Sequence, residues 1–230
     1  MPAESLCHDP RKRLFSIRKS EKIKPTRYEA RLKPISIRSN WPKSGWFMIT
    51  LIVLCITTIF ASSINPLLRF DRVAIYAGEL WRLITGHFVH LGAYHALMNI
   101  LGLILIRLIF PTDLTNKNLP IAMLFIALSS SLALLICSPQ LDWYLGFSGV
   151  LHGLFAFCIA LHLRPGISLD WLILGALVVK LSYEQLPAYD ANYLMDYIHA
   201  PVAVDAHLYG ALAGMIWAVL SRCRLVFPHR

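Results

Sequence analysis

The sequence predicts an all-α membrane protein, built as a bundle of six transmembrane helices. Composition supplies the first two observations: hydrophobic residues make up 57% of the 230 residues and charged residues only 15%, whereas about 25% of residues are charged in a typical soluble domain. The third observation is a succession of six apolar segments, each close to the roughly 20 residues that cross a bilayer as a helix.

Residues 1–45 form a basic tail ahead of the first apolar segment, with 12 Lys/Arg against 4 Asp/Glu. We expect a flexible cytoplasmic segment that contacts anionic lipid, because each basic residue near such a surface contributes about 1 kcal/mol. Nucleic-acid binding is the alternative use of such charge, and we expect no nucleic-acid partner. The apolar run starts only near Trp46, too late for a cleavable signal peptide.

The membrane domain is predicted over residues 46–222, followed by a short cytoplasmic C-terminus at 223–230. Its helices are expected at 46–68, 92–110, 119–137, 147–163, 168–184 and 203–221. The second half is less hydrophobic than the first, and its helices must face protein or water where they carry polar side chains. These side chains are Ser148 and His152 in the fourth helix, Lys180 and Glu184 in the fifth, and Asp205 and His207 in the sixth.

The distribution of Lys and Arg predicts how these helices are oriented. Basic residues mark the tail, the C-terminus and two of the connecting loops, whereas loops 138–146 and 185–202 contain none. Because cytoplasmic loops are enriched in Lys and Arg, both termini are expected in the cytoplasm. The long loop 69–91 is an exception on the outer side, and we expect it to be folded. Its basic residues are Arg69, Arg72 and Arg82.

Four polar side chains are predicted to meet near the outer face. The second, fourth and sixth helices all begin on that side, and their first turns carry His95, Asn99, Ser148 and His207. His95 and Asn99 are four residues apart, so they share one helix face. Because buried polar groups are costly within a bilayer, these residues are candidates for a functional site.

Four short motifs include or accompany these four residues. Trp81-Arg82 comes first, HxxxxHxxxN runs from His90 to Asn99, Gly-Phe-Ser-Gly spans 146–149, and AHxxGxxxG spans 206–214. With these motifs in this order, the chain resembles the rhomboid family of intramembrane serine proteases. The particular versions of the motifs are most similar to the bacterial rhombosortase branch of that family.

The resemblance implies a catalytic dyad without a carboxylate. Ser148 is the expected nucleophile and His207 the general base that accepts its proton and returns it to the leaving amine. The resemblance also implies an oxyanion hole made by the Ser148 backbone N–H and the side chains of His95 and Asn99. An N-terminal helical position suits this role, since its N–H groups are free and partially positive.

Supporting residues complete the expected site. Gly146 and Gly149 permit a tight backbone around the nucleophile, and Gly210 with Gly214 allows the sixth helix to approach the fourth closely. Such an approach brings the histidine to the serine. By resemblance, two residues support the structure of the outer loop, Arg82 and His90.

His152 departs from the pattern of many rhomboids, which carry tyrosine four residues after the nucleophile. Two roles are open for its imidazole, which lies on the same helical face as Ser148. It either packs on His207 and orients it, which we favour, or shares the role of base.

Other ionisable residues have structural interpretations. Lys180 and Glu184 lie one turn apart and can neutralise each other; the pair either holds its helix in place or contacts substrate. Asp205 points about 200° away from His207 on a helix, so we expect it to cap the helix rather than to complete a triad.

A metal site is the alternative interpretation of His87, His90 and His95. No HExxH motif and no nearby carboxylate completes such a site, so no metal and no cofactor is expected. The cysteines are scattered and odd in number, which argues against a disulfide framework. They are Cys7, Cys55, Cys137, Cys158 and Cys223.

The predicted function is that of an intramembrane serine endopeptidase that cleaves transmembrane segments of membrane proteins near the extracytoplasmic face. The rhombosortase resemblance implies substrates with glycine-rich C-terminal sorting tails and a location in the bacterial inner membrane, with the active site open to the periplasm. The alternative is a catalytically silent rhomboid-like protein that binds client transmembrane helices. Retention of all four polar residues of the site argues against the alternative, since a binder needs none of them.

Overall fold

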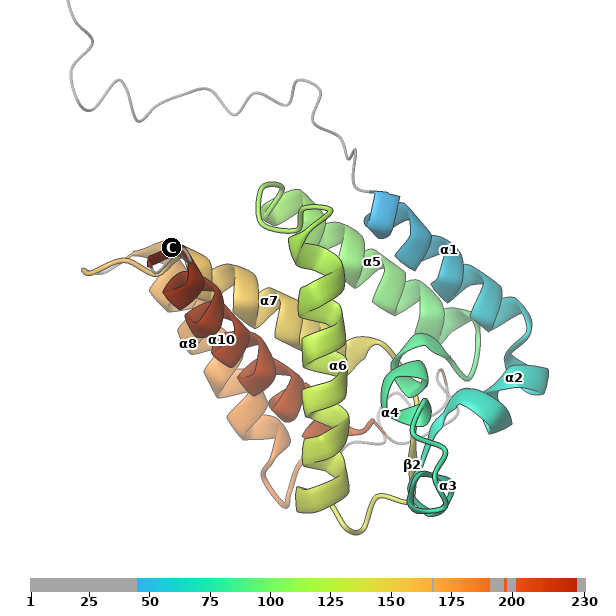
Figure 1. The fold of residues 1–230 in the computed structure, drawn as a ribbon. Helices are drawn as coiled ribbons and strands as arrows, with labels where there is room; N and C mark the ends of the chain where they lie inside the picture. The colour runs from blue at the N-terminus through green and yellow to red at the C-terminus, as the bar shows by residue number, and fades with distance from the viewer. Residues whose placement is uncertain (1–44, 167, 191–196, 198–201, 227–230) are drawn as a thin grey trace, which may run out of the picture. The chain divides into compact units, whose positions relative to one another are not determined.

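The structure is a computed structural model that describes residues 45–166, 168–190, 197 and 202–226. The predicted basic tail, apart from its last residue, and the last residues of the C-terminus lie outside this part of the chain. Long helices dominate the described residues (Figure 1). They are α1 (Gly45–Ile59), α5 (Ala93–Ile109), α6 (Asn118–Cys137), α7 (Ser148–His162), α8 (Leu169–Glu184) and α10 (Val204–Val226).

Prolines follow closely after four of these helices. Proline cannot donate the backbone hydrogen bond that continues a helix, and it disfavours helical geometry in the residue before it. Helices α5 and α6 end two residues before a proline, and α7 and α8 end three residues before one. The prolines are Pro111, Pro139, Pro165 and Pro187.

The first predicted helix, 46–68, is wrong as a single straight span. The chain breaks at Phe60, and α2 (Ala61–Leu68) turns by 108° from α1. Polar contacts hold this turn against the loop before α5: Thr57 donates to the Phe88 carbonyl over 2.6 Å, and the Asn65 amide donates to the His90 carbonyl over 2.8 Å. The run of apolar residues in the sequence could not reveal this turn, because the two residues of each hydrogen bond are 25 to 31 positions apart in the chain.

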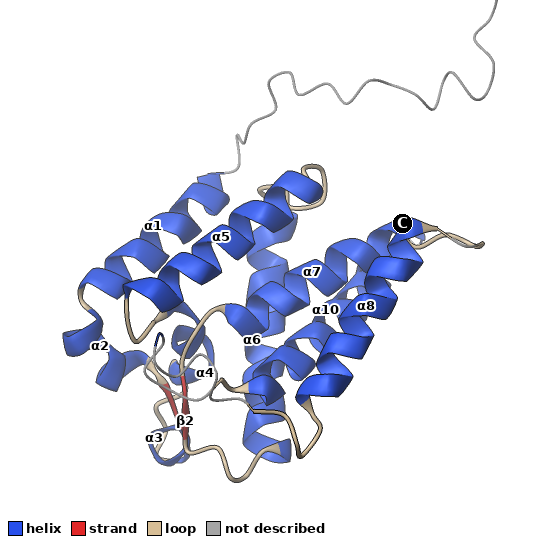
Figure 2. Cartoon of the chain, turned by 180° about the vertical axis from the view of Figure 1, so that it is seen from behind, coloured by secondary structure: helices blue, strands red, loops and turns tan. Residues whose placement is uncertain are grey.

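Helix α7 lies in the middle of the bundle. It packs against α5, α6, α8 and α10, and its most extensive contact is with α10. Figures 1 and 2, taken from opposite sides, both show α7, α8 and α10 side by side, with α1 beside α5. Most of α7 is therefore buried, and it carries Leu154 and Phe157 into the main apolar core.

The long loop 69–91 is folded, as the sequence analysis expected. It contains strand β1 (Phe70–Asp71) and the short helices α3 (Arg72–Tyr76), α4 (Arg82–Thr85) and η3 (Gly86–Phe88). Strand β1 pairs antiparallel with β2 (Trp143–Tyr144), which directly precedes the fourth predicted helix. This short ladder connects loop 69–91 to the segment that leads into α7.

The three arginines of this loop are used within the protein. Arg72 donates to four backbone carbonyls at and beyond the end of α6, over 2.7 to 3.0 Å, and so satisfies groups that a helix end leaves free. Arg82 is buried and binds Glu79 and the carbonyls of residues 66 and 69. Arg69 pairs with Asp71 over 3.1 Å. Because these three arginines bind other groups of the protein, their presence does not need to follow the Lys/Arg distribution that indicates membrane orientation.

Asp71 shows the electrostatics of this loop. Partial burial opposes its ionisation, but the Ala74 N–H and the Arg69 guanidinium outweigh burial and lower the pKa of the Asp71 carboxyl. The carboxylate caps the start of α3, a role that acidic residues commonly fill.

Two of the described helices, α6 and α10, are long and apolar enough to cross a membrane by themselves, and up to four spans result if each bent helix pair counts as one. Helices occupy all six predicted regions, but α7 has 15 residues and α8 has 16. The count of six spans therefore stays a prediction. Helix α10 also continues to Val226, beyond the expected end of the membrane domain at 222.

Candidate active site

Ser148 is the first residue of α7, and the turn before it depends on glycine. Gly146 has a φ of +125°, a conformation that side chains with a Cβ rarely adopt. Its N–H donates to the Gly86 carbonyl over 3.0 Å, and a Cβ at this position would lie 2.7 Å from the His95 ring. The Tyr144 hydroxyl donates to the Gly146 carbonyl. The turn thus sets the serine at the head of the helix.

His207 lies in the first turn of α10 and faces this serine. Its Nε2 is 3.0 Å from the Ser148 hydroxyl oxygen, within hydrogen-bond distance. His207 is buried, with 6% of its surface exposed. The structure therefore brings together two residues that are 59 positions apart in the sequence, as the expected dyad requires.

Backbone packing between α7 and α10 makes this distance possible. A Cβ on Gly210 would collide with the Gly149 carbonyl, and one on Gly214 would collide with the Gly153 carbonyl. The predicted reason for the AHxxGxxxG spacing, a close approach of the two helices, is confirmed. Gly149 contributes from the other side, since a Cβ there would lie 2.8 Å from the Ala206 carbonyl oxygen.

The expected dyad had no carboxylate, but the structure places one beside His207. The Glu184 carboxylate oxygens lie 3.2 and 3.3 Å from Nδ1 of His207, and Glu184 is buried, with 6% of its surface exposed. Because a carboxylate can only accept, Nδ1 carries the hydrogen, and Nε2 is left free to accept the Ser148 proton. From the sequence, Glu184 was expected only to pair with Lys180, and the pair either to hold its helix in place or to contact substrate.

His152 and Lys180 extend these contacts. His152 stacks on His207 with ring centres 4.2 Å apart, and its Nδ1 lies 2.8 Å from the Ser148 carbonyl oxygen. Lys180 lies 3.0 Å from His152 Nε2 and 2.6 Å from Glu184. Since the carbonyl accepts and the ammonium donates, both ring nitrogens of His152 are engaged. This arrangement favours the orienting role of His152 over a share in base catalysis.

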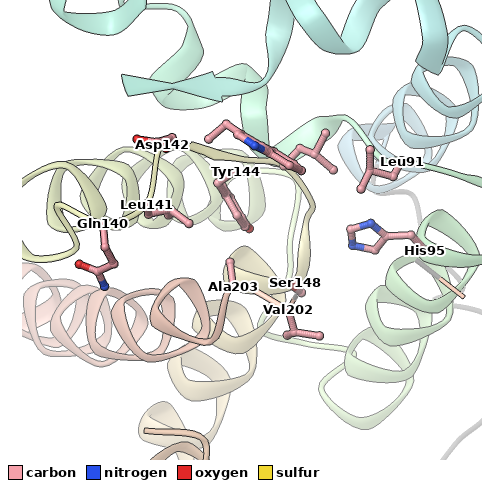
Figure 3. A pocket seen from close by; sticks show the side chains of 11 residues that line it. Leu91, His95, Gln140, Leu141, Asp142, Tyr144, Ser148, Val202 and Ala203 are labelled. Atoms are coloured by element: carbon pink, nitrogen blue, oxygen red, sulfur yellow. The ribbon is translucent and has the colours of Figure 1, made fainter. Parts of the chain in front are cut away.

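A cavity of about 280 Å³ opens beside Ser148. His95 reaches it from α5, Leu141 and Tyr144 line it from the segment before α7, and Ala203 lines it from the chain just ahead of α10 (Figure 3). Its walls are mainly apolar, with the serine and an imidazole at the surface. A peptide segment placed there meets the hydroxyl and the His95 ring together.

Asn99 is buried one turn after His95, and its amide nitrogen donates to the His95 carbonyl over 3.1 Å. An amide NH2 group has two hydrogens, so this bond leaves one for another acceptor. His90 packs edge-on against His95 with ring centres 4.9 Å apart. Arg82 and His90 both contact α2: Arg82 donates to the carbonyl of residue 66, and the His90 carbonyl accepts from the Asn65 amide.

The remaining polar residues form separate contacts. His87 is buried, with Nε2 3.0 Å from the Ala127 carbonyl and 2.9 Å from the Ser131 hydroxyl. Asp205 accepts from the Ser138 hydroxyl at the end of α6, away from His207. Among the described residues, no three His, Cys, Asp or Glu side chains are grouped in a way that could hold a metal ion.

Comparison with known families agrees with this arrangement. The family model described as the Rhomboid domain matches residues 77–223, more than half of the chain, and this range includes every residue of the site above. Comparison with curated proteins found no match. From the extent of the domain match, the chain belongs to the rhomboid family.

Proposed function

We propose that this protein is an intramembrane serine endopeptidase that cleaves transmembrane segments of other membrane proteins near the extracytoplasmic face. The observation that carries the proposal is the 3.0 Å contact between the Ser148 hydroxyl and Nε2 of His207, at the edge of a cavity. A serine hydroxyl is a weak nucleophile until a base within this distance accepts its proton.

The reaction proceeds in two stages. The Ser148 oxygen attacks the scissile carbonyl carbon while His207 takes the hydroxyl proton, and the new oxyanion is stabilised by hydrogen-bond donors. When the carbon–nitrogen bond breaks, His207 gives that proton to the leaving amine, and an acyl-enzyme remains. Water then attacks the ester with the help of His207, which releases the new carboxyl end and restores the serine.

The oxyanion donors are proposed to be the Ser148 backbone N–H and the side chains of His95 and Asn99. Ser148 is the first residue of α7, where the N–H groups have no partner within the helix and carry the positive end of the helix dipole. His95 shares the cavity with Ser148, and Asn99 retains one amide hydrogen beyond its bond to the His95 carbonyl.

The depth of the site follows from the length of α7. Fifteen residues of helix measure roughly 22 Å, less than the roughly 30 Å of the hydrocarbon layer. With its C-terminal end at the cytoplasmic surface, as proposed, α7 is too short to reach the outer surface of the membrane. Ser148, at the other end of the helix, then lies below that outer surface. Water must reach the serine through the cavity at its side.

The proposed substrates are membrane proteins with a glycine-rich C-terminal sorting tail, as in the rhombosortase branch. A helix hides its peptide carbonyls in hydrogen bonds, and glycine weakens it by about 1 kcal/mol relative to alanine, so a glycine-rich segment exposes a scissile bond more readily. The proposed location is the bacterial inner membrane, with both termini in the cytoplasm, the basic tail on anionic lipid, and the cavity open to the periplasm.

The test is covalent labelling of the detergent-solubilised protein with a fluorophosphonate, which needs no known substrate. Its phosphorus is attacked by the Ser148 oxygen, fluoride leaves, and the hydroxyl proton passes to His207. We expect labelling of the wild type and none above background for Ser148→Ala or His207→Ala. Absence of labelling in folded wild type would favour the alternative, a silent rhomboid-like protein that binds client helices.

A further inference from the structure

Glu184 lies where a third member of a serine protease triad lies. Its two carboxylate oxygens are 3.2 and 3.3 Å from Nδ1 of His207, on the opposite side of the ring from the Ser148 hydroxyl. In a Ser-His-Asp triad the carboxylate binds this same nitrogen, holds the ring in one tautomer, and stabilises the imidazolium that forms when the serine loses its proton.

The location of Glu184 in its helix makes a purely local role difficult to explain. It is the last residue of α8, where the helix dipole disfavours a negative charge, and its side chain is only 5% exposed. An unpaired carboxylate buried in this way is costly. Lys180 alone could neutralise it in a more exposed position, since the lysine side chain itself is 46% exposed. In its buried position, the Glu184 carboxylate instead reaches Nδ1 of His207.

The surrounding contacts form a closed ring with a single consistent assignment of hydrogens. His152 Nδ1 donates to the Ser148 carbonyl, and its Nε2 accepts from Lys180. Lys180 also donates to Glu184, which accepts from His207 Nδ1. Nε2 of His207 then accepts from the Ser148 hydroxyl. Each of these contacts joins one donor to one acceptor when both imidazoles are neutral with the hydrogen on Nδ1.

We propose that Glu184 is a positioning residue that completes a Ser148-His207-Glu184 triad, fixing the tautomer and orientation of His207 and stabilising its protonated form. Lys180 and the stacked His152 hold the carboxylate and the ring in place. This inference rests on the proposed function only for its catalytic consequence, because the tautomer of His207 can be measured in an inactive protein.

The first experiment compares rates of fluorophosphonate labelling in full-length protein. Glu184→Gln keeps the shape but replaces the carboxylate with an amide that can donate to Nδ1 and invert the tautomer. We expect the rate to fall on the order of 10²- to 10⁴-fold, as when an amide replaces the triad carboxylate. Glu184→Asp, which keeps the charge, should recover part of the rate. Asp205→Asn is the matched control, since this carboxylate binds Ser138 instead, and it should label like wild type.

The second experiment measures the tautomer directly. Nitrogen-15 spectra of histidine-labelled protein distinguish Nδ1–H from Nε2–H, and the His207 signal is identified by its loss in His207→Ala. We expect Nδ1–H in wild type and a loss of this preference in Glu184→Gln. A role limited to helix packing would leave the tautomer unchanged.

The outcomes separate the two proposals. If wild type is not labelled, the proposed function fails and the tautomer alone decides the role of Glu184. If wild type is labelled and Glu184→Gln labels within about threefold of it with the same tautomer, the triad is refuted and the proposed function stands. A wild-type His207 with its hydrogen on Nε2 would also overturn the triad, even if no variant at position 184 folds.

Discussion

At the scale of single residues, the site depends on side chains that are held from several directions. His207 contacts Ser148 at one nitrogen and Glu184 at the other, and His152 stacks on its face. Three contacts of different direction leave an imidazole little freedom to rotate. Such restraint is what a base needs, because its proton acceptor must already point at the nucleophile before substrate arrives.

Gly146 provides a prediction at this scale. Gly146→Ala should reduce fluorophosphonate labelling strongly, because it adds backbone strain of roughly 1–3 kcal/mol and places a Cβ 2.7 Å from the His95 ring. Gly78→Ala is the matched control, since Gly78 also has a positive φ of +104° but has nothing within 4 Å of a built Cβ. It should lose stability yet keep its labelling rate per folded molecule. Equal labelling by both variants would contradict this account of the turn.

At the scale of elements, the contact between α7 and α10 determines whether serine and histidine meet. The two backbones approach so closely that a methyl group on Gly210 or Gly214 would overlap a carbonyl of α7. Without a hydrophobic driving force between helices in lipid, close packing of this kind supplies much of the association energy. The same contact that stabilises the bundle therefore sets the geometry of the site.

Gly214→Ala tests this contact. Overpacking of this kind costs roughly 1–3 kcal/mol, so we expect a lower melting temperature in detergent together with slower labelling, because α10 must move away from α7. Gly175→Ala is the control on α8, where a built Cβ meets nothing within 4 Å. Alanine is favoured over glycine in a helix by up to about 1 kcal/mol, and this variant should be as stable as wild type or more so. A Gly214→Ala protein with wild-type stability and labelling would refute the role of the contact.

At the scale of the whole molecule, the orientation in the membrane remains the prediction with the widest consequences. The three arginines that contradicted the Lys/Arg pattern are bound within loop 69–91, to α2 or to the end of α6. Arginines bound within the protein in this way say little about membrane topology. The assigned orientation therefore rests on loops 138–146 and 185–202, which contain no Lys or Arg. Both are predicted on the outer side.

Cysteine accessibility in intact bacterial cells measures this orientation. In a variant whose five native cysteines are replaced by serine, Gln185→Cys lies in an exposed position after α8 and should react with a membrane-impermeant maleimide. A second variant that retains only Cys223, which is exposed near the end of α10, should react only after the cells are lysed. Reaction of Cys223 from outside, with protection of position 185, would reverse the proposed topology.

The sequence by itself determined the helical class and the approximate position of each long helix, and it pointed to the serine, histidine and glycine residues of the candidate site. These features follow from apolar segments and from motifs within short stretches of chain, where neighbouring residues carry the information. The folding of loop 69–91 was also foreseen, from the length of this connection.

Only the tertiary structure decided the bend after α1 and the carboxylate beside His207. The bend depends on Asn65 reaching the His90 carbonyl, and the carboxylate depends on the end of α8 lying against the start of α10. Glu184 and His207 are 23 residues apart, on different helices. No periodicity within one helix encodes such a contact, since it is fixed by the packing between helices rather than by the pattern along either one.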